Sequence, residues 1–211
     1  MEYEVRYYYS KEELGDLINK LSSYRELGQG LRTYEKTIQY NHSDDRYNFY
    51  SKDIDGRFRV RISSNDMDTK CMLSWKRRLS DTIETDINKE LEKEVRINSE
   101  DIDNFIYIIE NVMRFILVES YERYRNVFIN QDVEISIDEY PFGIALEIEN
   151  KSKDKNPYDV IKYWLDKLEL RIEDSYRLSW DDKYLELCKE QGKIVYNEVT
   201  FDKDMPVVKN K

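Results

Sequence analysis

The sequence predicts an α+β fold in which a closed eight-stranded antiparallel β-barrel surrounds a charged lumen, flanked by about four helices. Segments of alternating apolar and polar residues outnumber helical segments about two to one, and many follow one another through short turns. Their charged residues fall almost entirely on one face of each segment. We expect a single domain over residues 1–200, followed by a C-terminal tail at 201–211 that is prone to fray.

Four amphipathic segments predict the helices, and three of them begin at a residue suited to capping a helix. Ser10, Asn156 and Ser179 are the capping residues of these three helices, and the remaining helix follows Ser99. Pro157 fits the first position of the third helix, which should end near Leu170. Gly192 is suited to end the fourth helix because glycine adopts the left-handed conformation of a C-terminal cap.

Nine segments rich in Tyr, Ile and Val predict strands. They are 2–8, 33–40, 46–51, 57–63, 70–77, 89–97, 115–129, 132–138 and 143–149. The segment 89–97 contains KELEKEVR, whose acid–base spacing suits a helix about equally well. The acidic run 81–86 is expected to be a solvated connection between strands.

Composition excludes several kinds of site. The formal charge of -10 disfavours a general nucleic-acid surface, and the single histidine, His42, makes a catalytic triad or a His-ligated zinc improbable. The two cysteines form no C-x-x-C pair, and the glycines form no phosphate-binding loop. Chemistry must therefore rest on carboxylates, Lys and Arg. We expect no membrane partner and a cytoplasmic protein, because no run of about 20 apolar residues and no signal peptide occurs.

The charged faces of the predicted strands indicate a ligand site. A solvated face of an ordinary sheet is the simpler interpretation for any one strand. These strands, however, favour Arg over Lys and group like charges, as in Arg57, Arg59 and Arg61, where repulsion is relieved by a bound ligand. Clustered carboxylates suit Mg²⁺ or Mn²⁺, and clustered guanidiniums suit phosphate. Together they predict a site for a metal and a polyphosphate.

The order of charged motifs resembles the CYTH superfamily of triphosphate tunnel metalloenzymes, which includes tripolyphosphatases, thiamine-triphosphatases and class IV adenylyl cyclases. The similarity covers most of the chain, and its most specific part is the stretch IDEYPFGIALEIE, which resembles the family's D-x-x-x-x-G-x-x-x-E-x-E element. The matching residues are Glu2, Glu4 and Arg6, then Arg59 and Arg61, Lys76, Glu92 and Glu94, Arg123, Arg125 and Phe128, Asp138, Gly143, Glu147 and Glu149, and the pair Ser175-Tyr176.

The resemblance implies roles for these residues. Glu2, Glu4, Glu147 and Glu149 would bind Mg²⁺ or Mn²⁺, and the substrate phosphates would be held by Arg59, Arg61, Lys76, Arg123 and Arg125. Glu92, Glu94 and Asp138 would complete the acidic wall. Glu4, Glu149, Arg6 and Lys76 are the candidate catalytic residues, with Glu4 or Glu149 orienting the attacking water. Arg6 departs from the lysine usual in the family, and a guanidinium cannot be deprotonated in a protein.

Four functions remain open from the sequence. The first is metal-dependent hydrolysis of inorganic triphosphate or a small organic triphosphate. The second is class IV-type synthesis of cyclic AMP from ATP, which needs a pocket for adenine. The third is a non-catalytic module that binds polyphosphate or nucleotide, suggested by Arg6. The fourth, an acidic domain with an unrelated role, leaves the ordered motifs unexplained. The sequence leaves the oligomeric state open.

Overall fold

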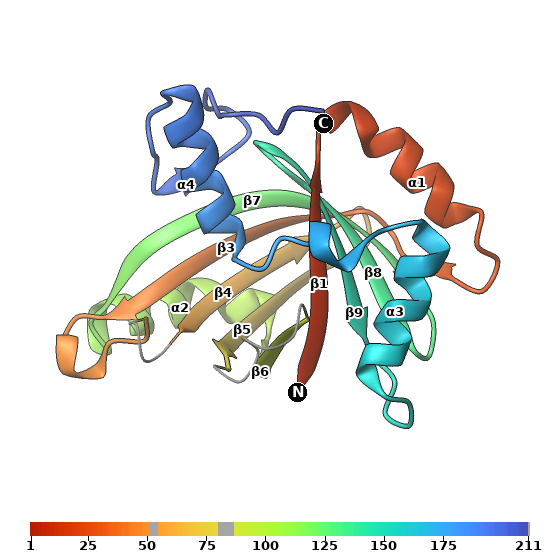
Figure 1. Cartoon of the computed structure of the whole chain (residues 1–211). Coiled ribbons are helices and arrows are strands. Elements are labelled where there is room, and N and C mark those ends of the chain that lie inside the picture. Colours follow the sequence, from red (N-terminus) through yellow and green to blue (C-terminus); the bar gives the residue numbers. More distant parts are fainter. Residues whose placement is uncertain (51–54, 80–86, 211) are drawn as a thin grey trace.

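The computed structural model describes residues 1–50, 55–79 and 87–210, and eight of its strands close into an antiparallel barrel. Figure 1 shows how the strands and helices are arranged. These strands are β1 (Glu2–Tyr9), β3 (Thr33–His42), β4 (Gly56–Ser64), β5 (Thr69–Arg78), β6 (Asn88–Ile97), β7 (Phe115–Ile129), β8 (Val133–Tyr140) and β9 (Gly143–Asn150). They pair in the order β7-β3-β4-β5-β6-β1-β9-β8, and β8 pairs back with β7. Two short strands, β2 (Gly28–Gln29) and β10 (Glu198–Val199), also pair with β7.

The alternation of residues within each strand separates the lumen from the core. Side chains in a strand point to opposite faces with a period of two, so Val5 and Tyr7 of β1 pack outward while Glu4 and Arg6 point into the lumen. The apolar outer faces are then covered by helices, which bury them away from water. The predicted barrel with a charged lumen and apolar outer faces is therefore confirmed. Because β8 pairs back with β7, the barrel itself has no free edge.

Three of the helices cover the outside of β1, β7, β8 and β9. The helices α1 (Leu14–Ser22) and α3 (Pro157–Leu168) pack over β1, β8 and β9, where α3 buries Ile161 and Trp164 (Figure 1). The helix α4 (Trp180–Gln191) lies apart from them, against residues of β7, β8 and β9. Each fully buried aliphatic or aromatic side chain contributes about 1.5–3 kcal/mol, so these contacts fix the helices on the barrel.

The predicted caps of α3 and α4 are confirmed. The side chain of Asn156 accepts a hydrogen bond from the backbone N–H of Tyr158, and Pro157 occupies the first turn. Ser179 and Asp182 form a capping box at the start of α4, and Gly192 ends it in the left-handed conformation at φ 63°.

Other elements differ from the prediction. The strand expected at 46–51 is wrong: Asp45–Tyr47 form a turn of 3-10 helix, in which Asp44 caps the N–H of Arg46, and residue 51 lies outside the described residues. The helix expected after Ser99 instead begins at Ser99, with a 3-10 turn, Ser99–Asp101, whose N-cap is Asn98. Then α2 (Ile102–Tyr107) continues as a π-helical turn, Ile108–Val112. The segment 89–97 is strand β6, so its helical alternative is wrong. The run 81–86 also lies outside the described residues.

The C-terminal tail is held against the barrel, contrary to the expected fraying. Val207 exchanges two hydrogen bonds with the side chain of Gln191 on α4, and the N–H of Val208 donates to the carbonyl of Phe142 at 2.8 Å. Among the described residues, every helix is too short or too polar to cross a bilayer.

Candidate functional site

The inward-facing side chains line a cavity of about 240 Å³ inside the barrel. Seven carboxylates and seven cations line it. They are Glu2, Glu4, Glu92, Glu94, Glu134, Glu147 and Glu149, with Arg6, Arg59, Arg61, Lys76, Arg123, Arg125 and Lys151. The structure thus brings together every candidate site residue named above, except that Asp138 is fully buried in the barrel wall behind the arginines it binds.

The charges are divided between two walls. Most of the carboxylates come from three consecutive strands, β6, β1 and β9, whereas the arginines other than Arg6 come from β4 and β7. In a closed barrel of this order β4 lies across from β9, and β7 lies across from β6. The lumen therefore presents an acidic wall opposite a cationic wall. A metal and a phosphate group could bind between these walls.

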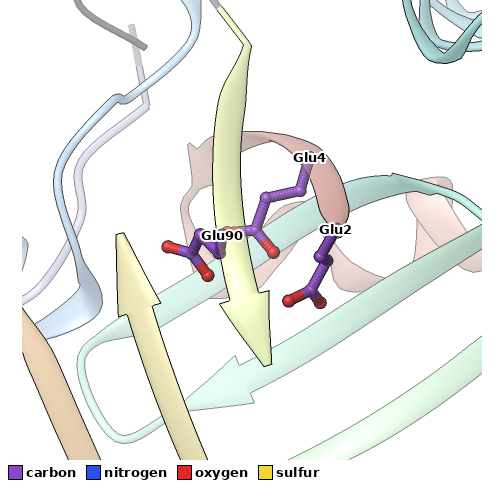
Figure 2. A group of neighbouring side chains, drawn as sticks. All are labelled: Glu2, Glu4 and Glu90. Atoms are coloured by element: carbon purple, nitrogen blue, oxygen red, sulfur yellow. The ribbon is translucent and has the colours of Figure 1, made fainter. Parts of the chain in front are cut away.

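Glu2, Glu4 and Glu90 form a compact carboxylate cluster on the acidic wall (Figure 2). Each offers an oxygen atom within 4.8 Å of the others. Strand register creates the cluster, because Glu2 of β1 lies directly opposite Glu90 of β6. Glu90 is 2% exposed, and the arrangement of three hard oxygen donors suits Mg²⁺ or Mn²⁺. Glu90 was missed as a site residue, although its position on the charged face of 89–97 was visible in the sequence.

The ammonium of Lys76 provides the positive charge inside this cluster. Its Nζ lies 2.6 Å from Glu90 Oε2, 2.9 Å from Glu2 Oε2 and 3.4 Å from Glu4 Oε2. Burial alone lowers the pKa of Lys76, but attraction to Glu4 and Glu2 outweighs burial and raises it. Lys76 therefore stays charged and occupies the position between carboxylates where a divalent cation would be attracted.

Glu147 has different partners from the carboxylates of this cluster. Arg6 Nε donates to its Oε1 at 2.6 Å, and Arg125 Nη2 donates to its Oε2 at 2.9 Å. Burial raises the pKa of the Glu147 carboxyl, but the charges of Arg6 and Arg125 outweigh burial and hold it well below its usual range. Arg6 Nη2 also donates to Glu4 Oε1 at 3.1 Å, and Arg6 Nη1 to the carbonyl of Leu178 at 3.1 Å.

Glu149 lies opposite Glu4 in the pairing of β1 with β9. Burial, with repulsion from Glu2, raises the pKa of Glu149 to about 8, although Lys151 Nζ donates to its Oε1 at 2.5 Å. The carboxyl is consequently able to exchange a proton near neutral pH. Glu149 contrasts with Glu147, which stays ionised because two guanidiniums bind it.

Buried carboxylates neutralise two of the arginines on the cationic wall. Asp138 accepts hydrogen bonds at 2.7 Å from Arg123 Nη1 and at 2.7 and 2.8 Å from Arg125. Glu35 of β3 accepts from Arg123 Nε at 2.7 Å and from the hydroxyl of Ser63 at 2.8 Å. These bonds fix the two guanidiniums in position. Glu35 was missed, because a single glutamate in the segment TYEKT matches no motif.

Arg59 and Arg61 carry the least neutralised positive charge in the lumen. Arg59 approaches only Glu92, at 3.4 Å, and within the described ranges no carboxylate lies within 4.0 Å of a nitrogen of Arg61. Burial, with repulsion from Arg61, lowers the pKa of Arg59. The phenol of Tyr121 responds to the same field: burial raises its pKa, but the nearby charges of Arg123, Arg59 and Arg61 outweigh burial and lower it. This part of the lumen is therefore suited to an anion.

One end of the lumen is formed by α4. Trp180, the first residue of α4, lines the cavity, stacks on Tyr140 with ring centroids 6.2 Å apart, and lies 4.3 Å from the ring of Tyr121. The segment before α4 is attached to β1, since the N–H of Tyr176 donates to the carbonyl of Arg6 at 2.7 Å.

The opposite end is lined by Glu94, Lys151 and Glu134, of which the first two are exposed. The aromatic residues at the α4 end were missed as lining residues, because aromatic residues in strands and helices usually indicate packing.

Comparisons with known proteins agree with this architecture. No protein-family model and no curated relative matches the sequence. Among solved structures, the PH1819 protein of Pyrococcus horikoshii OT3 is similar with a TM-score of 0.66 and 26% identity, over 90% of this chain and 99% of that chain.

Two more distant structures share the fold. A putative adenylyl cyclase from Hippeastrum, HpAC1, described as having a dominant triphosphatase activity, is similar with a TM-score of 0.57 and 17% identity, over 93% of this chain and 99% of that one. A putative adenylate cyclase from Vibrio parahaemolyticus is similar with a TM-score of 0.59 and 13% identity, over 85% and 96% of the two chains. The closed barrel of eight antiparallel strands is therefore a fold that this chain shares with these solved structures, two of which are described as putative adenylyl or adenylate cyclases.

Proposed function

We propose that the protein binds a triphosphate together with Mg²⁺ or Mn²⁺ in the lumen and hydrolyses the anhydride bond to its terminal phosphate, which is released. The observation that supports this most directly is the juxtaposition of two under-neutralised guanidiniums, Arg59 and Arg61, with a carboxylate-rich wall across a closed barrel. Clustered arginines bind phosphate oxygens through charge-assisted hydrogen bonds, and clustered carboxylates bind hard divalent cations. The likeness to a protein described by its triphosphatase activity supports the same reaction.

The donors present fit the metal that this function requires. Glu2, Glu4 and Glu90 supply closely spaced carboxylate oxygens, and Glu149 lies beside them opposite Glu4. A divalent cation bound there would polarise phosphate oxygens and offset their charge. Glu147 was expected among the ligands, but both of its oxygens are bound by arginines, so we assign it to holding Arg6 and Arg125.

The chain's own residues divide the remaining tasks. Arg59 and Arg61 hold the phosphate oxygens, while Arg123 and Arg125, fixed by Asp138, supply charge from the neighbouring part of the same wall. Lys76, which three carboxylates of the acidic wall hold in this structure, would supply a charged donor to a phosphate bound beside them. Glu149, which lies opposite Glu4 beside the carboxylate cluster, is suited to orient the attacking water.

The volume of the lumen favours an inorganic triphosphate or the triphosphate end of a small molecule. A cavity of about 240 Å³ lies below the roughly 300–1,000 Å³ of pockets that enclose drug-sized ligands. A nucleoside would therefore extend beyond the charged lumen, which disfavours the cyclase reaction because the ribose hydroxyl must be oriented beside the phosphates. Catalytically silent binding is the second candidate, favoured by Arg6, which has no titratable proton near neutral pH.

The experiment measures phosphate release from inorganic triphosphate, thiamine triphosphate and ATP with Mg²⁺, Mn²⁺ or EDTA, with nucleotide products resolved. Arg61→Gln should weaken triphosphate binding about 10- to 150-fold, the equivalent of a charged hydrogen bond worth about 1.5–3 kcal/mol. Arg32→Gln is the matched control, because Arg32 pairs with Glu139 outside the lumen.

Metal-dependent phosphate release that Arg61→Gln impairs and Arg32→Gln leaves intact would support the proposal. Cyclic AMP as the product would assign the cyclase reaction. Metal-dependent binding without turnover would assign a binding module, and equal effects of the two substitutions would refute the anion site.

A further inference from the structure

All three nitrogens of the Arg6 guanidinium are hydrogen-bonded to groups of the protein itself. Its guanidinium donates to Glu147 Oε1 at 2.6 Å, to Glu4 Oε1 at 3.1 Å and to the carbonyl of Leu178 at 3.1 Å. The residue is 8% exposed, and its own carbonyl accepts the N–H of Tyr176. Arg6 is therefore fixed between two strands and the segment that leads into α4.

These bonds place a permanent positive charge between two carboxylates of the acidic wall. Glu147 lies opposite Arg6 in the pairing of β1 with β9, and its second oxygen is bound by Arg125. A divalent cation could reach the Glu147 oxygens only if a guanidinium left them. Departure of Arg6 would also break its bond to Leu178 and leave a charged group buried in the barrel.

A lysine in place of Arg6 would hold Glu147 less firmly. A guanidinium binds carboxylates in a planar, bidentate manner and stays charged at every accessible pH, whereas an ammonium is compact and mobile. Lys76 illustrates the contrast, because its single Nζ is shared by three carboxylates, whereas three separate nitrogens of Arg6 are each bound to a different partner.

We propose that Arg6 substitutes for a divalent cation at Glu147, so that the chain binds its metal without Glu147 and binds no second metal at the α4 end of the acidic wall. Arg6 is a positioning residue in this scheme: it neutralises Glu147 and anchors Leu178 while the metal binds elsewhere. The inference rests on the proposed function for the kind of metal, Mg²⁺ or Mn²⁺.

The test measures Mn²⁺ bound to the full chain by electron paramagnetic resonance and calorimetry, without substrate. Glu147→Gln should leave the Mn²⁺ affinity within about threefold of Glu134→Gln, which removes the same charge from the mouth of the same lumen. Arg6→Gln should add a second Mn²⁺ per chain or tighten binding about tenfold or more, whereas Arg61→Gln, an equal change of charge that frees no carboxylate, should not.

The double substitution Arg6→Gln with Glu147→Gln should lose the gain, which would locate the new ligand at Glu147. Circular dichroism and thermal unfolding check that each variant is folded. If Arg6→Gln does not fold, the Mn²⁺ affinity of Glu147→Gln alone tests the inference. The inference would be overturned if Glu147→Gln weakened Mn²⁺ binding about tenfold or more beyond the effect of Glu134→Gln. Equal changes of Mn²⁺ binding in Arg6→Gln and Arg61→Gln would also overturn it.

Because the readout is metal binding, the proposal can fail while triphosphate hydrolysis is still observed, and it can succeed in a protein that does not turn over. If neither the unaltered chain nor Arg6→Gln binds Mn²⁺, the inference is overturned.

Discussion

Asp138→Asn tests the energetics of the cationic wall most directly. Asp138 is fully buried and is the shared acceptor of Arg123 and Arg125, with three hydrogen bonds of 2.7 to 2.8 Å. Asparagine has nearly the same shape, but it removes the negative charge and turns an N–H₂ group toward a guanidinium. The substitution therefore leaves two buried cations short of their compensating charge without creating a cavity.

The expected loss is large. Removing one partner of a buried ion pair costs about 3–5 kcal/mol, because the remaining charge stays buried. For a chain of this length each kcal/mol corresponds to about 2–4 °C, so the midpoint of thermal unfolding should fall by about 6–20 °C. Urea unfolding should show a lower midpoint with an unchanged slope, as expected when stability changes without a change in the surface exposed.

Glu139→Gln is the matched control. Glu139 is the next residue on β8, points outward, and pairs with Arg32, whose side chain is 49% exposed, so its loss should cost no more than about 1 kcal/mol. Tripolyphosphate should restore more stability to Asp138→Asn than to the control, since an anion in the lumen replaces part of the missing charge. Equal losses in the two variants, or no difference in rescue, would refute the view that buried carboxylates hold the arginines in place.

Two further predictions concern other parts of the fold. Burial, with repulsion from Asp181, raises the pKa of Glu119 to about 8, so the folded chain holds a proton that the unfolded chain releases near pH 4.5. The free energy of unfolding should therefore decline as pH rises through this window. Glu149 contributes to the same decline, so Glu119→Gln should make it shallower, and not abolish it, in urea titrations from pH 5 to about 9. A Cβ on Gly143 would lie 2.6 Å from Val208 Cγ2, so Gly143→Ala should cost about 1–3 kcal/mol in urea unfolding. A Cβ added at Gly15 would meet no atom within 4 Å, so Gly15→Ala should instead stabilise α1 by about 0.5–1 kcal/mol. Similar losses of stability in the two variants would contradict the packing of the tail against Gly143.

The sequence predicted the faces of the strands well because face assignment is local. Alternation with a period of two is visible within a single segment, so the inward positions of Arg59, Arg61 and Glu147 could be assigned without knowing their neighbours. Capping residues are equally local, which explains the accurate ends of α3 and α4.

The composition of the carboxylate cluster could not be predicted, because it depends on register between strands. Glu92 and Glu94 were the expected acidic residues of β6, yet the pairing of Glu2 with Glu90 brings Glu90 into the cluster and leaves Glu94 exposed. A shift of register changes which residues of two strands meet, and no pattern within β6 distinguishes its three glutamates. The partners of Arg6 were unpredictable for the same reason, since Leu178 is 172 residues away.

The position of α4 has a consequence for the order of events in the proposed hydrolysis. Among the described residues, Trp180 lines one end of the lumen and exposed Glu94 and Lys151 line the other, so substrate and product of the proposed reaction would share the exposed end. A linear polyphosphate would have to enter by its terminus, so cleavage would proceed from chain ends and never from the middle. The released phosphates would compete with the next substrate for the same passage, and their departure, rather than the cleavage of the anhydride, would then limit the rate at saturation.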